Sequence, residues 1–327
     1  MYDVVAFGET MLRLSPPNYH RIEHAFSFEA NAGGAEMSVA CNVSRLGLKT
    51  AWVSRLTDNS MGHFIRNKAR EQGVDTSFVQ WTKDDRVGIY FVEFGANPRP
   101  SRVIYDRAHS AMSKVKPGEF EWSTILKDVK WFYTTGITPA LSKSAADATL
   151  EALKAAKQMG CKVACDLNYR VRLWTEDEAH KCMDPLMEYV DVLISTEEDT
   201  AKVLKIKGDN YQDVARKLAE HYKFEAVCIT IRTDLTVLHN QWTAIVYANG
   251  KVYEDKTYDV EIIDRVGAGD SFSSGFLYGY TTGDIEKGLR YGNAYAALLH
   301  SIPGDINWCT LQEVETLLKG GGTRISR

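Results

Sequence analysis

Short apolar segments alternate with segments of helical periodicity along nearly the whole chain. Runs rich in Val, Ile, Ala and aromatic residues, typical of buried strands, occupy residues 3–7, 52–56, 131–134, 162–167, 190–194 and 226–231. Between them, apolar residues recur every three or four positions, as in 144–159 and 285–301, which indicates amphipathic helices. This alternation predicts a parallel sheet covered by helices, a doubly wound three-layer α/β/α sandwich.

Two β-rich regions depart from this alternation. Residues 88–94 and 102–106 flank a Gly-Ala-Asn-Pro-Arg-Pro turn and predict a hairpin, and part of the irregular segment 11–32 suits an edge or lid strand. We therefore expect a single domain, residues 1–327, with a small β-sheet lid formed by about 11–32 and 85–107. Such a lid excludes water when it closes over a substrate. The glycine-rich tail, 320–327, is expected to be flexible.

Composition and charge exclude several classes of function. The 327 residues are 44% hydrophobic and 25% charged, as in an ordinary soluble protein, and the net charge of −4 does not favour a general binder of nucleic acid or membrane surfaces. No apolar run reaches membrane-spanning length, and the N-terminus does not read as a signal peptide. The six cysteines lack metal-ligand spacing, so we expect a reduced, cytoplasmic protein.

A glycine-rich turn near the C-terminus joins a predicted strand, 260–263, to a predicted helix. Gly267, Ala268 and Gly269 carry no bulky side chain, and free N–H groups together with the macrodipole bind anions at such a helix start. Asp270 follows directly; we expect the dipole to keep it ionised and its carboxylate to accept the proton of an attacking hydroxyl. The alternative is that Asp270 only caps the helix and the glycines only form a turn.

Asp166, Asn168 and Arg170 follow the predicted strand 162–167 in alternation. In extended backbone they would project to one side, at the strand end where ligands bind in parallel sheets. An acid, an amide and a cation on one face suit a polyhydroxylated, anionic ligand. The alternative is a structural Asp–Arg ion pair.

The predicted lid contributes Tyr90, Tyr105 and Arg107. Taken alone, the two tyrosines are better explained by strand packing. Arg107 is suited to bidentate recognition of a carboxylate, and its alternative is an arginine that is solvated or paired with Asp106.

Two motifs resemble the signatures of the ribokinase-like (PfkB) carbohydrate kinase family. The first is Gly-Gly-Ala-Glu-Met-Ser at 33–38, with Ser38 where the family commonly has Asn. The second runs from Asp264 through Gly-Ala-Gly-Asp to Gly275-Phe, with Arg-Val after the first Asp where the family usually has Thr. The resemblance spans nearly the whole chain. It implies ATP and Mg²⁺ as cofactors, an anion hole formed by the N–H groups of 268–270, Asp270 as general base, and a homodimer through the lid.

Within that family, Asp-x-Asn-x-Arg together with Tyr105-Asp-Arg resembles 2-keto-3-deoxygluconate kinases. The resemblance assigns Arg107 and Arg170 to the substrate carboxylate. It assigns the other substrate contacts to Gly34, Tyr90, Tyr105 and Asn168. The implied reaction is ATP-dependent phosphorylation of 2-keto-3-deoxygluconate to 2-keto-3-deoxy-6-phosphogluconate.

The resemblance also implies nucleotide contacts at Ser195, Thr196, Thr230, Arg232, Gly267, Gly269 and Asn293. Where the family commonly reads Asn-x-x-Glu, this chain has Thr196 and Asp199. No direct metal ligand is expected; water-mediated contact with Mg²⁺ is expected near Glu198 and Asp199. The resemblance places Asn293 and Ala297, one helical turn apart, beside the adenine. The alternatives are favourable first-turn charge for the acidic residues, a solvated side chain for Arg232, and core packing for Ala297.

Three other functions stay open on the sequence. One is a fructokinase, ribokinase or nucleoside kinase of the same fold, acting on a neutral acceptor. Another is an oxidoreductase, although the third glycine falls at the wrong spacing for G-x-G-x-x-G. The last is a sugar-binding or regulatory protein without catalytic activity.

Overall fold

A central sheet of ten strands organises the computed structural model, which describes residues 1–321. Its path is β13 (Lys251–Glu254), β12 (His239–Ala248), β11 (Ala226–Thr236), β10 (Val192–Ser195), β9 (Lys162–Asp166), β8 (Trp131–Thr135), β1 (Val4–Phe7), β4 (Thr50–Thr57) and β5 (Val79–Thr82), with β14 (Tyr258–Glu261) paired to β12. All neighbours from β11 to β5 are parallel, and β12 reverses the direction. The expectation for the tail mostly concerns residues 322–327, which lie outside the described residues.

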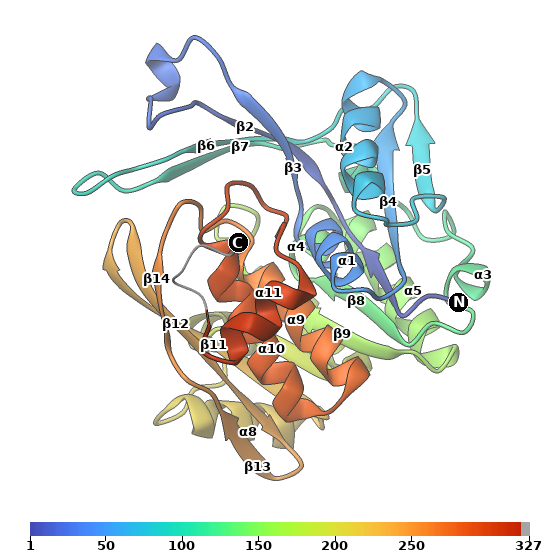
Figure 1. Ribbon diagram of the computed structural model, residues 1–327. Helices are drawn as coiled ribbons and strands as arrows, with labels where there is room; N and C mark the ends of the chain where they lie inside the picture. Colours follow the sequence, from blue (N-terminus) through green and yellow to red (C-terminus); the bar gives the residue numbers. More distant parts are fainter. Residues whose placement is uncertain (322–327) are drawn as a thin grey trace.

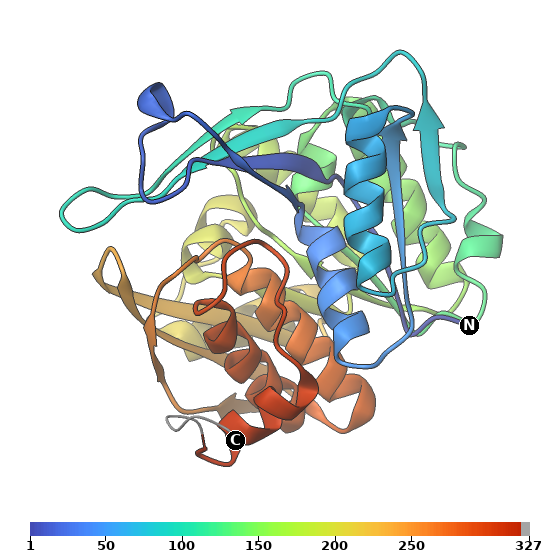
Figure 2. The same cartoon turned by 45° about the horizontal axis from the view of Figure 1, so that its top comes forward.

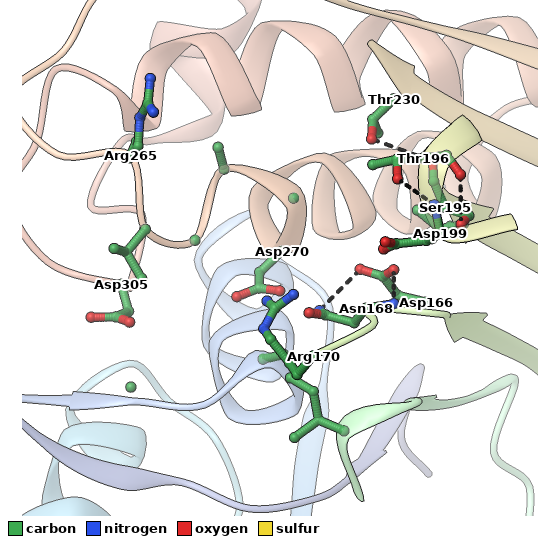
Figure 3. A pocket seen from close by; sticks show the side chains of 18 of the residues that line it. Asp166, Asn168, Arg170, Ser195, Thr196, Asp199, Thr230, Arg265, Asp270 and Asp305 are labelled. Atoms are coloured by element: carbon green, nitrogen blue, oxygen red, sulfur yellow. Dashed lines mark hydrogen bonds between the residues drawn. The ribbon is translucent and has the colours of Figure 1, made fainter. Parts of the chain in front are cut away.

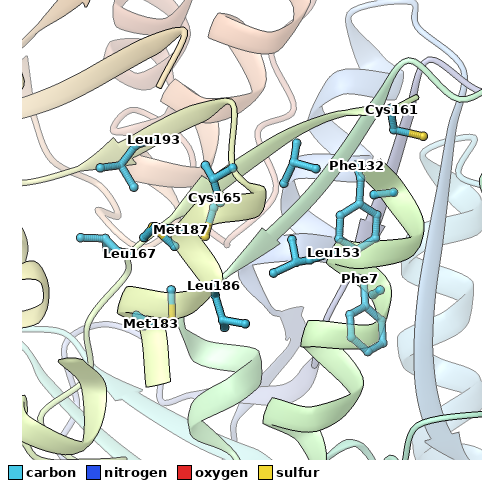
Figure 4. Close-up of a cluster of buried hydrophobic side chains, with 14 of the residues drawn as sticks. Phe7, Phe132, Leu153, Cys161, Cys165, Leu167, Met183, Leu186, Met187 and Leu193 are labelled. Carbon is cyan, nitrogen blue, oxygen red and sulfur yellow. The ribbon is translucent and has the colours of Figure 1, made fainter. Parts of the chain in front are cut away.

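Helices cover both faces of this sheet (Figure 1). Alternation within a strand explains the two cores, because Val5 and Phe7 pack into one and Val4 and Ala6 into the other. The first core, part of which Figure 4 shows, is covered by α3 (Trp122–Ile125), α5 (Lys143–Gln158), α6 (Glu176–Leu186) and α8 (Tyr211–Tyr222). The second is covered by α1 (Ala35–Arg45), α2 (Ser60–Glu71), α9 (Ala268–Thr282) and α10 (Ile285–Leu299), and α11 (Leu311–Leu318) packs beside α10.

Short helical elements complete the described chain. They are η1 (Ile22–His24), η2 (Met112–Lys114), α4 (Ile137–Ala140), η3 (Met187–Tyr189), α7 (Glu197–Asp199) and the π-helical turn η4 (Thr200–Leu204). Among residues 1–321, no helix combines the length and the apolar character needed to span a membrane.

A separate four-stranded sheet stands out from one end of the molecule (Figure 2). Its order is β3 (Glu29–Gly33), β2 (Met11–Ser15), β6 (Ile89–Glu93) and β7 (Arg102–Asp106). Apart from Gly33, these strands lie inside the two segments where we expected a lid. The prediction of a doubly wound α/β/α sandwich with a small second sheet is confirmed.

The strand expected at 260–263 lies two residues earlier. β14 pairs with β12 through Tyr258–Glu261, and the chain then leaves the sheet, with Ile263 54% exposed. The glycine turn therefore begins from a loop instead of a strand end.

Candidate active site

A cavity of about 600 Å³ lies between the lid sheet and the carboxyl ends of β9, β10 and β11. Most of the sequence-predicted residues line it: Gly34, Tyr90, Tyr105, Arg107, Asn168, Arg170, Ser195, Thr196, Glu198, Asp199, Thr230, Arg232, Gly267, Ala268, Gly269 and Asp270. The two motifs, which lie more than 200 residues apart in the chain, therefore meet at one site.

The glycine turn opens the start of α9 toward this cavity. Gly267 has φ 92°, in the left-handed region that favours glycine, and a Cβ there would lie 2.5 Å from the Asp305 carbonyl oxygen. The first bond of the helix runs from Ser271 N–H to Gly267 O (2.8 Å), so the N–H groups of Gly269 and Asp270 precede the helical ladder. A Cβ at Gly269 would meet no atom within 4 Å, which leaves room for an anion.

Asp270 lies at the centre of this site (Figure 3). Burial in the cavity, together with the nearby Asp166 carboxylate, raises its pKa to about 8, while Arg170 opposes the rise. Our expectation that the helix dipole keeps Asp270 ionised is therefore wrong at neutral pH, because desolvation outweighs the dipole. A carboxyl group with a pKa near 8 is suited to accept a proton at physiological pH.

Asn168 turns the chain at the end of β9. Its φ of 42° is left-handed, so the extended backbone that we expected for 166–170 is wrong. The turn lets Asn168 donate from N–H and Nδ2 to Asp166 Oδ1 and Oδ2 (3.0 and 3.2 Å). Asp166, Asn168 and Arg170 still line the cavity, and burial with the nearby Asp199 raises the pKa of Asp166 to about 7.

Arg170 does not pair with Asp166, so the alternative of a structural ion pair is not supported. Its Nη1 donates to the Tyr169 carbonyl (3.0 Å), and within residues 1–321 it has no carboxylate partner closer than 4 Å. Figure 3 shows its guanidinium directed toward Asp270. The charge of Arg170 therefore faces the cavity.

Arg107 pairs with Glu9, a residue for which the sequence predicted no role. Its Nε donates to Glu9 Oε2 (2.9 Å), Nη2 bonds the same oxygen, and Ser110 Oγ donates to Glu9 Oε1. The suggested pair with Asp106 is wrong, because Asp106 binds Arg86 instead (2.7 Å). Arg107 thus lines the cavity with its charge partly neutralised.

The paired glycines of the first motif permit close packing beneath the lid. A Cβ at Gly33 would overlap Tyr90 Oη, and one at Gly34 would overlap the Glu9 carbonyl oxygen. Tyr90 stacks on Tyr105 with ring centroids 5.9 Å apart. Ser38 is fully buried in α1, away from the cavity, so this departure from the family pattern does not change the cavity lining.

The acidic segment after β10 forms the first turn of α7, as the alternative interpretation predicted. Thr196 caps it by accepting from Asp199 N–H (3.1 Å), and Thr230 donates to the Ser195 carbonyl (3.3 Å). Asp199 faces the cavity, and burial raises its pKa, whereas Glu198 pairs with Lys202. Among residues 1–321, no group of three or more His, Cys, Asp or Glu side chains is arranged to hold a metal ion directly.

Arg232 and Arg265 lie at one rim of the cavity and share the carboxylate of Asp234 (3.3 and 2.9 Å). Arg265 also donates to Asn240 Oδ1 (3.0 Å). Asn293 lies elsewhere: it is buried in α10, donates to Asp255 Oδ2 (3.2 Å) and does not line this cavity. The structure therefore does not bring Asn293 to the predicted nucleotide contacts.

Charged residues near the cavity that were not predicted as site residues include Glu9, Arg13, Glu36 and Asp305. Glu9 follows the end of β1, where ligand contacts are expected in parallel sheets, and Glu36 follows the paired glycines. Glu36 is fully buried, with Oε1 accepting from Thr135 Oγ1 (2.8 Å) and Thr138 Oγ1 (2.7 Å), and burial raises its pKa. No local sequence signal distinguishes Arg13 or Asp305.

The chain is similar in sequence and in structure to known carbohydrate kinases. Residues 1–312 match the sequence model of the pfkB family carbohydrate kinases. The 2-dehydro-3-deoxygalactonokinase of Haloferax volcanii is 40% identical over 326 residues, 99% of each chain, and the 5-dehydro-2-deoxygluconokinase of Bacillus licheniformis is 31% identical over 92% of this chain and 90% of its own. The crystal structure of 2-dehydro-3-deoxygluconokinase from Thermotoga maritima superposes with a TM-score of 0.95, at 44% identity, over 97% of this chain and 98% of that one.

Proposed function

Because this chain belongs to the pfkB family of carbohydrate kinases, we propose that it transfers the γ-phosphoryl group of ATP to 2-keto-3-deoxygluconate, giving 2-keto-3-deoxy-6-phosphogluconate. The observation that carries the proposal is a single cavity that brings together the open start of α9, the Asp270 carboxyl group with its pKa near 8, and the guanidinium groups of Arg107 and Arg170. The three relatives support a sugar acid, since each is named for the phosphorylation of a deoxy-keto aldonate.

The proposed transfer uses Asp270 as general base. The terminal hydroxyl oxygen of the acid attacks the γ-phosphorus, the bond between that phosphorus and the β,γ-bridging oxygen breaks, and ADP leaves. Asp270 takes the hydroxyl proton, and the N–H groups at 268–270 stabilise the charge on the transferring phosphoryl oxygens. A base of this kind contributes about 10²–10⁴-fold to the rate.

Mg²⁺ fits the donor set as a hydrated ion. Asp199 offers oxygen ligands on the wall of the cavity, and it lies close enough to Asp166 to raise the pKa of that residue. When bound with ATP, the ion neutralises phosphate charge. We propose that Asp199, capped by Thr196, receives it through water, and that Ser195, Thr230 and Arg232 complete the phosphate side.

The carboxylate of the substrate is the proposed partner of Arg170 and Arg107. A planar guanidinium recognises a carboxylate through two parallel bonds, which a neutral hydroxyl cannot reproduce. Asn168, Tyr90, Tyr105 and the Gly34 backbone are proposed to contact the hydroxyl and keto groups.

One observation favours a second candidate, a kinase of a neutral sugar. Glu9 already pairs with Arg107, so only Arg170 presents a cationic charge without a carboxylate partner within the described part of the site. A neutral ketose or pentose needs no further cation, and in that case Arg107 would be purely structural.

We also propose that the chain forms a homodimer through the outer face of the lid sheet. Phe26, Phe28 and Ile104 are exposed on the lid segments by 99%, 38% and 39%. Exposed apolar side chains of this kind mark interaction surfaces. Sedimentation equilibrium of the wild type and of Phe28→Asp/Ile104→Asp tests the dimer, which the double substitution should dissociate.

We propose a cytoplasmic location, which the use of ATP and the six free cysteines support.

The test of the proposed reaction is ADP release from ATP and Mg²⁺ with four acceptors: 2-keto-3-deoxygluconate, its galactonate epimer, fructose and ribose. We expect turnover with the acids that falls at least 100-fold in Asp270→Asn. Arg170→Ala should lose activity with the acids selectively. Turnover with neutral sugars alone would replace the acid by the second candidate, and turnover that survives Asp270→Asn would reject the proposed base.

A further inference from the structure

Arg13 is a buried arginine of lid strand β2 that bonds to the opposite wall of the cavity. Its side chain is only 2% exposed. Nη2 pairs with Asp264 Oδ2 (2.5 Å) and Nη1 with Asp305 Oδ2 (2.6 Å), while Nε donates to Ser15 Oγ (3.2 Å). One guanidinium thus connects the lid sheet to two segments that lie 251 and 292 residues away in the chain.

Asp264 carries this contact to the catalytic turn. Its Oδ1 accepts from Val266 N–H (3.0 Å) and its Oδ2 from Gly304 N–H (3.0 Å). Gly267 follows at once, packed against the Asp305 carbonyl, and α9 begins at the next residue. The position of the anion-binding helix start therefore depends on Asp264.

Asp305 carries the contact to the substrate side. Tyr90 lies beside Arg13 in the β2–β6 pairing and donates to Asp305 Oδ1, while Arg13 holds Oδ2. Both oxygens of this cavity-lining carboxylate are thus bonded to the lid sheet. Asp305 is also one of the groups whose charge raises the pKa of Asp270.

We propose that Arg13 is a positioning residue for phosphoryl transfer: it holds the catalytic turn through Asp264 and the cavity wall through Asp305, and it couples both to the lid sheet. The inference rests on the proposed kinase reaction. Arginine suits this role because its rigid fork bonds two carboxylates at once, which a lysine ammonium cannot do in the same geometry. Without the guanidinium, two buried carboxylates would face each other unpaired.

The test compares Arg13→Lys and Arg13→Met with the same substitutions at Arg86. Arg86 is a matched control because it is also a lid arginine paired with an aspartate, Asp106, but it is exposed and lies outside the cavity lining. Steady-state kinetics with the sugar acid, thermal melting and the pH profile of kcat/KM are measured for all four variants.

Arg13→Lys should stay folded and lose about 10- to 100-fold in kcat/KM for the acid, because a displacement of about 1 Å in the turn has this effect. The KM for ATP should change little. In Arg13→Met the acidic limb of the profile should also move to higher pH, because Asp305 then loses its cationic partner and its charge is one of those that raise the pKa of Asp270. The Arg86 variants should match the wild type. Two results would overturn the proposal. One is wild-type kinetics in Arg13→Lys. The other is a loss of activity in Arg13→Met that is no larger than its unfolded fraction, with the acidic limb of the pH profile unmoved.

Amide hydrogen exchange separates this inference from the reaction on which it rests. If the wild type phosphorylates no sugar acid, the proposed function fails, but exchange at residues 264–270 and 303–306 still tests the connection. Exchange there should be faster in Arg13→Lys than in the wild type and in Arg86→Lys. Unchanged exchange in all three proteins would reject the positioning role itself.

Discussion

The raised pKa of Asp270 predicts a steep pH dependence of the transfer reaction. With a pKa of about 8, roughly 1% of Asp270 is ionised at pH 6, about 10% at pH 7 and about 90% at pH 9. Only the ionised form accepts a proton from the attacking hydroxyl, so kcat/KM for the acid should rise about 90-fold between pH 6 and pH 9. The measurement is kcat/KM at saturating ATP and Mg²⁺ across this range.

Asp166→Asn tests the physical cause of this profile. Asp166 is the largest contributor after burial to the raised pKa of Asp270, and an asparagine there keeps an oxygen that can accept from Asn168 N–H. The acidic limb should therefore move to lower pH, with proportionally more activity at pH 6 than in the wild type. Because the two carboxyls titrate as a coupled pair, the comparison is between whole profiles.

Titration of ATP itself is common to all variants, so it cannot produce a shift between them. Asp177→Asn is the matched control, since this exposed aspartate pairs with Lys205, lies outside the cavity lining and is absent from the groups that act on Asp270. A profile that is flat from pH 6 to 9 in the wild type, or one that Asp166→Asn leaves in place, would refute the assignment of the limb to Asp270.

Three further outcomes are expected. Asp270→Asn should stabilise the protein at high pH. Because the pKa of Asp270 is raised in the folded state, that state binds more protons than the unfolded state between about pH 4 and 8, so the wild type loses stability as pH rises through this range. The melting temperature of the variant should exceed that of the wild type by at least about 2 °C at pH 9, which corresponds to about 1 kcal/mol, and by less at pH 5. Equal melting temperatures at pH 9 would contradict the raised pKa. Gly269→Ala should melt at or above the wild-type temperature, since its Cβ meets no atom within 4 Å and alanine favours a helix. Its kcat should nevertheless fall at least tenfold, because the methyl group occupies the anion site. A retained kcat would exclude an anion site at this position. Gly34→Ala should instead destabilise the fold by about 1–3 kcal/mol, as measured by urea unfolding, because its Cβ overlaps the Glu9 carbonyl; an unchanged midpoint would contradict the packing described for this junction.

The residues that line the cavity show which parts of the site could be predicted from local sequence patterns. Residues of the two motifs and of the 166–170 segment were placed at one site, because strand ends and helix starts are local features that meet at one edge of a parallel sheet. Asn293 does not line the cavity, and helical spacing alone does not say which face of α10 turns toward it, so its nucleotide contact stays a prediction. The extended conformation of 166–170 failed because the left-handed turn at Asn168 is stabilised by its own bonds to Asp166.

By itself, the sequence determined the alternation of strands and helices, the second sheet and the glycine turn before α9. Each of these depends on periodicity or on backbone freedom within a few neighbouring residues. Only the tertiary structure decided the partners of the charged groups: Glu9 for Arg107, 98 residues away, and Asp264 and Asp305 for Arg13. It also decided the protonation of Asp270, because desolvation and the charge of Asp166 depend on what the fold packs around a carboxyl group, which no local pattern encodes.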